Sequence, residues 1–240
     1  NQIAIEINES RVSDTESLKI FIDTYRNHGF IIALDDIGAG HSNLNRVAMV
    51  KPDILKIDML LINNIDKECY KQEVLKSLVG LSKRIGALVV AEGLEREEEA
   101  IIVLDSGVDM LQGFYFSKPQ PIEPILFSQF RGKKAYIAAK FKDYRLNKVN
   151  SEKLRRQADD LEVRNMVHEL KTATRDNFDS KLKDLANTYS NVECIYILDE
   201  SGIQISGTIF NYHKLSERKR PIFKPARKGT DHSLKDYYFL

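Results

Sequence analysis

The first 130 residues alternate short apolar runs with longer amphipathic stretches. The apolar runs are rich in Ile, Val, Leu and Phe, as is typical of buried β-strands, and they occupy 3–7, 30–35, 54–58, 87–93 and 110–116. The stretches between them place apolar residues three to four positions apart, which predicts helices. These helical stretches lie at 15–29, 67–86 and 96–107, and each ends at a glycine, a common stop signal.

This alternation of strands and helices predicts an α/β fold. Continuous apolar strands separated by helices indicate a parallel sheet that is covered on both faces. Four or more consecutive strand–helix units fit either a doubly wound sheet or a (β/α)₈ barrel. In a barrel, catalytic groups gather at the carboxyl ends of the strands.

Polar residues stand at the end of every expected strand: Glu6, Asp35 with Asp36, Lys56 with Asp58, Glu92 and Gln112. Adjacent aspartates such as Asp35 and Asp36 repel each other, and without a nearby cation one of their pKa values would rise. Carboxylates are preferred ligands of Mg²⁺ and Mn²⁺, and two of them can serve a metal pair. The pattern therefore predicts a divalent-metal site at this edge of the sheet.

Each of these residues also has an ordinary structural interpretation. Asp35 and Asp36 could cap a helix, Lys56 could form an ion pair at the end of its strand, and Glu92 could cap the next helix. Gln112 could satisfy backbone groups. The joint occurrence at successive strand ends favours a site over these separate explanations.

The chain changes character after residue 130. Residues 1–130 hold 13 Lys and Arg against 20 Asp and Glu, whereas the rest holds 23 against 15, which indicates a domain boundary. Residues 131–190 have a charged helical pattern with broken apolar stripes, and 192–206 reads as two strands around a turn. The stripes predict that the helix pairs with that of a second copy, giving a homodimer.

Composition narrows the class of protein. The cysteines, Cys69 and Cys194, fit no disulfide or metal spacing, so we expect a reducing, cytoplasmic location. No apolar run has the length of a membrane span, and we expect none. The basic stretch 215–229 could attract nucleic acid or an anionic membrane, but such runs are more commonly solvated loops. A nucleic-acid polymer is therefore not an expected partner.

Five motifs in order resemble the EAL-type cyclic di-GMP phosphodiesterase domain. They are "EINES" (6–10), "DDIGAGHSNL" (35–44), "PDILKID" (52–58), "VVAEGLE" (89–95) and "LQGFYFSKP" (111–119). The resemblance covers roughly the second half of the family domain. It implies a (β/α)₈ TIM-like barrel, of which residues 1–130 form the C-terminal part. We expect a helical linker at 131–190 to follow, and then the start of a small α+β domain at 191–240.

The segment after residue 150 resembles, less specifically, a PAS/Cache-like regulatory module. The resemblance rests on a long helix followed by "IYILDESGIQIS" (195–206). Such a module would bind a small-molecule ligand or mediate dimers, and the alternative is a small α+β packing domain.

The resemblance to the EAL-type domain also implies roles for individual residues. Glu6 and Asp35 would bind one Mg²⁺ or Mn²⁺ ion and Asp36 the second, in a two-metal site. Glu92 would act as the general base, and Lys56 would orient the attacking water or stabilise phosphate charge. Supporting roles would fall to Glu9, Glu95 and Gln112, with Gly38 and Gly40 shaping the loop after the aspartates.

The implied activity is metal-dependent hydrolysis of cyclic di-GMP to the linear dinucleotide in bacterial second-messenger signalling. The alternative is a degenerate relative that binds cyclic di-GMP as a receptor or scaffold without cutting it. A glutamate and an asparagine ligand of the family pattern would lie upstream of Asn1, so we expect residues 1–240 alone to lack turnover. Within the covered part, Asn8 replaces threonine and Ile37 replaces an aromatic residue.

Overall fold

The computed structural model describes residues 3–8, 14–39, 44–120, 126–211, 225–235 and 237, with only the backbone for 126–130. The chain forms two compact units, Asn1–Val149 and Asn150–Leu240. The division therefore falls beyond the boundary near residue 130 that the charge pattern indicates. Each unit is described by itself.

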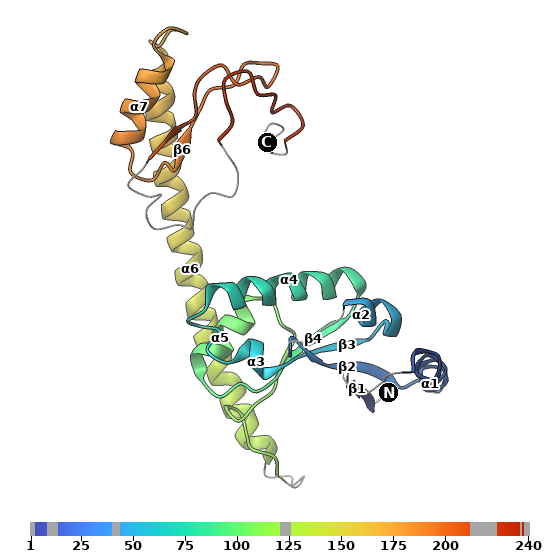
Figure 1. Ribbon diagram of the computed structural model, residues 1–240. Coiled ribbons are helices and arrows are strands. Elements are labelled where there is room, and N and C mark those ends of the chain that lie inside the picture. Colours follow the sequence, from blue (N-terminus) through green and yellow to red (C-terminus); the bar gives the residue numbers. More distant parts are fainter. Residues whose placement is uncertain are drawn as a thin grey trace. The chain divides into compact units, whose positions relative to one another are not determined.

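The N-terminal unit is built on a five-stranded parallel sheet in which neighbouring strands follow the chain order (Figure 1). Its strands are β1 (Ala4–Asn8), β2 (Ile31–Ile37), β3 (Ile54–Ile57), β4 (Leu88–Ala91) and β5 (Met110–Leu111). The prediction of an α/β fold with a parallel sheet is thus confirmed. The strand β5 is shorter than the apolar run 110–116, because the chain turns at Gly113 to pack its backbone against Leu94.

Helices connect the strands of this sheet. They are α1 (Thr15–Asn27), α2 (Leu44–Val50), α3 (Met59–Ile62), α4 (Cys69–Ile85) and α5 (Glu97–Asp105). Three of them match the amphipathic stretches in the sequence, whereas α2 and α3 are too short to give a clear period. Asp14 caps α1 by accepting from the backbone N–H of Glu16, and Gly86 ends α4 in the left-handed conformation.

The core of the N-terminal unit lies between the sheet and its helices. Side chains of β2 and β3 form its centre, with Ile32, Leu34, Leu55 and Ile57 fully buried. α1 contacts β2, and α4 contacts β4 and α5. Burial of apolar surface stabilises this arrangement by about 25 cal/mol per Å². The packed strands hold their carboxyl ends, where the polar residues lie, in fixed positions.

The C-terminal unit combines helices with a small antiparallel sheet. The helix α6 (Leu126–Leu170) runs into this unit, which also holds α7 (Phe178–Thr188), β6 (Cys194–Ile195) and β7 (Ile209–Phe210). Met166 of α6 packs on Leu182 and Leu185 of α7 in a separate small core. The expected turn after residue 198 is present, with a bridge between Leu198 and Gln204.

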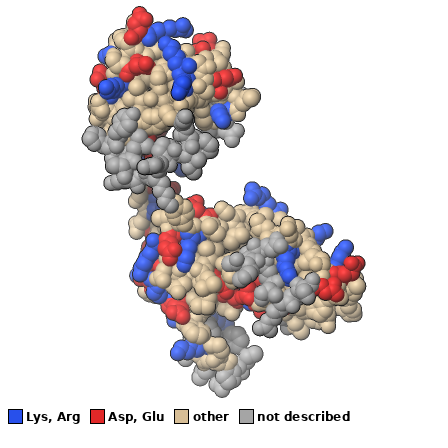
Figure 2. All heavy atoms as spheres, in the orientation of Figure 1, with Lys and Arg blue, Asp and Glu red and all other residues tan. Residues whose placement is uncertain are grey.

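Two features of the described residues concern the kinds of partner: the hydropathy of the helices and the distribution of charge on the surface. None of the helices in the described part of the chain is long and apolar enough to cross a membrane. On the face seen in Figure 2, Lys and Arg side chains are interspersed with Asp and Glu across the described residues. That mixture differs from the single broad basic patch that marks many nucleic-acid-binding surfaces.

One ion cluster ties α6 to α5 within the N-terminal unit. The carboxylate of Asp105, whose side chain is 7% exposed, accepts from Arg145 Nη1 at 2.7 Å and from Lys148 Nζ. Burial alone would raise the pKa of Asp105, but the hydrogen bonds from Lys148 and Arg145 outweigh it and lower the pKa. The carboxylate is therefore ionised over most of the pH range.

Replacing this carboxylate should weaken the N-terminal unit in a pH-dependent way. We expect Asp105→Asn to lower the free energy of unfolding at pH 7 by about 1–3 kcal/mol. A depressed pKa in the folded state gives stability that is full above the unfolded value of about 3.9 and is lost as the pH falls through the folded value. Urea unfolding at pH 7 and pH 3 checks this, with Asp23→Asn on the exposed face of α1 as control. An equal loss at both pH values would contradict it.

Candidate active site at the strand ends

Three carboxylates meet on one lysine at the carboxyl edge of the sheet. Lys56 Nζ of β3 lies 2.8 Å from Glu6 Oε2 of β1, 3.1 Å from Asp35 Oδ1 of β2 and 2.8 Å from Glu92 Oε1 after β4. The Lys56 side chain is 8% exposed, while its neighbours Leu55 and Ile57 are fully buried. The apolar strand thus carries its one charged side chain directly into the acidic cluster.

The charges of this cluster shift the pKa values of two members. Burial alone would lower the pKa of Lys56, but its contacts with Glu6, Glu92 and Asp35 outweigh burial and raise it. Burial raises the pKa of Glu92; Lys56 opposes that effect, and the negative charges of Asp35 and Glu6 add to it. Lys56 is therefore a permanent cation here, and Glu92 is a better proton acceptor than an exposed glutamate.

A bulge in β2 explains how two consecutive aspartates reach the same edge. Adjacent side chains of a regular strand point to opposite faces. The pairing of β2 with β3 joins Leu34 to Leu55 and Ile37 to Ile57, so that Asp35 and Asp36 together oppose Lys56. Two residues opposite one define a β-bulge, a feature often found beside active sites. Asp36 has a φ of 62°, a left-handed conformation that costs energy for a residue other than glycine.

The second aspartate makes a different contact from the first. Asn8 Nδ2 at the end of β1 donates to Asp36 Oδ2. Gly38, two residues later, has a φ of 104°, which a residue with a side chain rarely adopts. The backbone of the expected loop therefore favours glycine at position 38. Glu9 and Gly40, the other residues assigned to this loop, lie outside the described residues.

The remaining site residues line a pocket beside the cluster. Glu92 and Glu95 form part of its wall, and Gln112 faces them from the end of β5. The backbone of Gln112 also accepts from Leu94 N and donates to Ala91 O, which joins the end of β5 to the segment after β4. The pocket has a volume of about 270 Å³ and is also lined by Asp58, Met59, Gly93, Gly113 and Phe114.

The structure thus groups the candidate residues into two neighbouring sets. Glu6, Asp35 and Glu92 contact Lys56, whereas Glu95 and Gln112 line the pocket that Glu92 shares with them. Sequence reasoning missed Asn8 as a partner of Asp36. Asp58, which the sequence placed among the polar strand ends without a role, lines the pocket, and its carboxylate also accepts from Leu60 N to begin α3.

The chemistry of the oxygen donors suits a divalent cation. One ammonium group faces three carboxylates, which leaves an excess of negative charge. Asp35 Oδ1 is buried and lacks a hydrogen bond among the described residues, its contact with Lys56 being one of charge. Among these residues, no three acidic, His or Cys side chains are already arranged around a common metal position. Carboxylate oxygens in excess of their cation fit Mg²⁺, Mn²⁺ or Ca²⁺.

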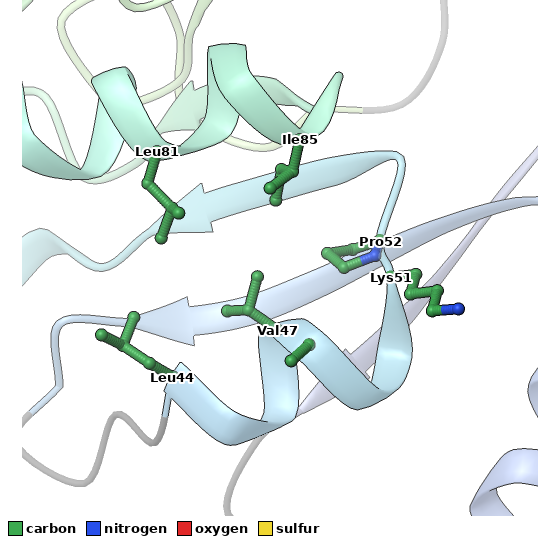
Figure 3. Close-up of a pocket in the computed structure, with 7 residues that line it drawn as sticks. Leu44, Val47, Lys51, Pro52, Leu81 and Ile85 are labelled. Carbon is green, nitrogen blue, oxygen red and sulfur yellow. The ribbon is translucent and has the colours of Figure 1, made fainter.

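A second pocket, between α2 and α4, has a different character. It has a volume of about 470 Å³ and an apolar lining that includes Val47, Pro52 and Leu81. In Figure 3 the Lys51 side chain extends away from these apolar groups. Of these two pockets, the strand-end pocket is therefore the one with convergent polar side chains, among them Glu92, Glu95 and Gln112.

The N-terminal half of the chain is similar to a known family. Residues 1–119 match the family model of the EAL domain. The probable cyclic di-GMP phosphodiesterase PdeN of Escherichia coli is 37% identical over 123 residues, 51% of this chain and 24% of PdeN. The cyclic di-GMP phosphodiesterase PdeR of the same organism is 30% identical over 120 residues, 50% of this chain and 18% of PdeR.

A relative from Bacillus subtilis matches beyond the EAL domain. YkuI, an uncharacterized EAL-domain protein, is 29% identical over 217 residues, 88% of this chain and 52% of YkuI. The crystal structure of YkuI with its substrate c-di-GMP and calcium superposes with a TM-score of 0.73 and 25% identity, covering 98% of this chain and 57% of that one. This chain therefore spans about half the length of YkuI and a quarter or less of the two E. coli proteins.

Removing the central ammonium should expose the repulsion between the carboxylates. We expect Lys56→Met to lower the free energy of unfolding by roughly 1–3 kcal/mol at pH 7, because Glu6, Asp35 and Glu92 lose their shared cation. Added Ca²⁺ should stabilise this variant more than the parent, since a cation can replace the lost charge. Thermal unfolding with and without Ca²⁺ measures both effects, and the exposed Lys67→Met is the matched control. A variant as stable as the control would show that the carboxylates do not depend on Lys56.

Proposed function

We propose that the N-terminal unit belongs to an enzyme that hydrolyses one phosphodiester of cyclic di-GMP to give the linear dinucleotide. The observation that carries this proposal is the meeting of Glu6, Asp35 and Glu92 on Lys56 at the carboxyl edge of a parallel sheet. That edge is where α/β barrels place their catalytic groups. The relatives PdeN and PdeR, which carry cyclic di-GMP phosphodiesterase names, support the choice of substrate.

The metal ligands in this proposal are Glu6, Asp35 and Asp36. Their hard oxygen donors favour Mg²⁺ or Mn²⁺ in a two-metal site, and the structure of the relative YkuI was obtained in complex with c-di-GMP and calcium, another divalent ion. When bound, such metals supply positive charge to the phosphate and lower the pKa of an attacking water. The acidic cluster of this chain would hold that charge beside the substrate.

Glu92 would accept the proton of the attacking water, and Lys56 would stabilise the developing negative charge. Water would add to phosphorus and pass one proton to Glu92 as the ester P–O bond breaks. Glu92 would then return that proton to the departing oxygen, which leaves as a hydroxyl. The raised pKa of Glu92, which burial causes, suits a general base. Lys56 would keep Glu92 oriented and would stabilise negative charge on the phosphate oxygens.

The other candidate residues would support this chemistry. Glu95 and Gln112 would shape the pocket next to the reacting phosphate, while Gly38, with Glu9 and Gly40, would hold the loop that follows the aspartates. We also propose that the five strands form part of a (β/α)₈ barrel. The alternative function is a degenerate receptor that binds cyclic di-GMP without cutting it, and the presence or absence of turnover separates the two.

Asp35→Asn should abolish hydrolysis while the fold survives. The amide keeps the shape of Asp35 but loses the charge that the proposed metal requires. We expect turnover by the full-length protein to fall by roughly 100-fold or more, because a lost ligand acts on the transition state directly. Chromatography of the linear product with saturating Mg²⁺ or Mn²⁺ measures the rate, and the exposed Asp23→Asn should match the parent.

Two results of this assay would count against the proposal. Equal turnover by Asp35→Asn and the parent would remove Asp35 from the metal site. A full-length parent that binds cyclic di-GMP but never yields the linear product would favour the receptor alternative.

A second copy of the chain is the protein partner that we propose. Leu154 and Leu161 of α6 are 68% and 60% exposed although both are large and apolar. Such residues on a long helix favour pairing between helices. The C-terminal unit would then join two copies and could also take a small-molecule ligand, as expected for a PAS/Cache-like module at 191–240.

Charged substitutions on this helix should separate the copies. We expect Leu154→Lys with Leu161→Lys to convert a dimer into a monomer in sedimentation velocity runs, whereas Glu152→Lys, exposed on the same helix, should not. Identical sedimentation of the parent and the double variant would refute pairing through this helix.

A further inference from the structure

Asp66, Arg96 and Glu99 form a second cluster of charged residues, separate from the contacts of Lys56. Arg96 forms a fork with Asp66, its Nη1 at 3.2 Å from Oδ2 and its Nη2 at 2.5 Å from Oδ1. Arg96 Nη2 also donates to Glu99 Oε1 at 2.8 Å. Two-pronged guanidinium–carboxylate pairs fix geometry as well as charge. The cluster therefore holds its members in one arrangement.

Glu99 is the buried centre of this cluster. Its side chain is 2% exposed, and Oε1 accepts from Asn64 N at 2.9 Å while Oε2 accepts from Glu95 N and Arg96 N, each at 3.2 Å. Burial alone would raise the pKa of Glu99, but these backbone donors and Arg96 lower it. Asn64 has a φ of 57°, an unfavourable conformation that its bond to Glu99 helps to hold.

The two segments that Glu99 joins both begin at the site. One segment runs from Lys56 through Asp58 and α3 to Asn64 and Asp66. The other runs from Glu92 through Gly93 to Arg96 at the start of α5. Each segment therefore has a site residue at one end and a member of the charged cluster at the other.

The segments also touch near the site. A Cβ at Gly93 would lie 2.3 Å from Met59 Cβ, so the two segments pass each other with no room for a side chain at this position. Gly93 also has a φ of 70°. Asp58, Met59, Gly93 and Glu95 all line the pocket beside Glu92. A shift of one segment against the other would change the pocket and the Lys56–Glu92 contact together.

We propose that Glu99, with Arg96 and Asp66, is a positioning element that sets Glu92 against Lys56 and fixes the wall of the pocket. This inference rests on the proposed function for its catalytic consequence. The geometric part, the link between Glu99 and the Lys56–Glu92 contact, stands on the contacts alone. Supporting residues that orient catalytic groups change activity by roughly 10–100-fold when they are lost.

The test compares Glu99→Gln with Glu97→Gln in the full-length protein. Both variants remove one negative charge from the first turn of α5. Glu97 lies outside the cluster, and its ion pair with Lys140 is long, with Oε1 at 4.0 Å from Nζ. We expect Glu99→Gln to lower kcat by about 10-fold or more with a smaller change in KM. Arg96→Lys keeps the charge and loses the fork, so it should also lower kcat. Glu97→Gln should match the parent.

A second readout does not need turnover. The Nζ resonance of Lys56, recorded by NMR on the full-length protein, reports the hydrogen bonds of its ammonium group. It should shift or broaden in Glu99→Gln and stay unchanged in Glu97→Gln. If Glu99→Gln does not fold, Asp66→Asn at the outer side of the cluster replaces it in both measurements.

The outcomes separate the two proposals. An unchanged kcat and an unchanged Lys56 resonance in Glu99→Gln, even with a lower melting temperature, would overturn the positioning role and leave the proposed function standing. A parent without turnover whose Lys56 resonance responds only to Glu99→Gln would refute the proposed activity and support the positioning role.

Discussion

The contact of Lys56 with three carboxylates is the interaction on which the site depends. Each carboxylate comes from a different strand or strand end, so the ammonium joins β1, β2 and β4 through the strand that lies among them. A single positive charge cannot balance three negative ones. The cluster therefore holds itself together in the absence of other ions and retains an attraction for a divalent cation.

The bulge in β2 brings a second aspartate, Asp36, to the edge where Asp35 contacts Lys56. Without the register shift between Leu34 and Ile37, one of Asp35 and Asp36 would point away from the edge. The cost is backbone strain at Asp36, and the contact with Asn8 helps to offset it. Asn8 stands where the family pattern has threonine, and its amide can donate to Asp36 as a hydroxyl could.

Much of the fold could be predicted because its signals are local. Apolar runs and glycine stops gave the five strands and the helices α1, α4 and α5, and the polar ends of the strands gave Lys56 and its carboxylate partners. The bulge, the short helices α2 and α3 and the role of Glu99 could not be predicted. They depend on contacts between distant segments, and Glu99 reads as an ordinary acidic residue in the first turn of a helix. The catalytic, metal-binding and supporting roles assigned to the site residues, including Glu9 and Gly40, stay predictions.

Calorimetric titration of cyclic di-GMP into the full-length protein tests the central claim most directly. Calcium is the divalent cation named in the YkuI complex, and a cation bound at the proposed carboxylate site should bridge the acidic cluster to the phosphates. We predict that cyclic di-GMP binds at least about 10-fold more tightly in the presence of Ca²⁺ than in the presence of a chelator. That ratio corresponds to about 1.4 kcal/mol of binding free energy. Binding of equal strength in both conditions would contradict it, because the carboxylates would then not recognise the ligand through a cation.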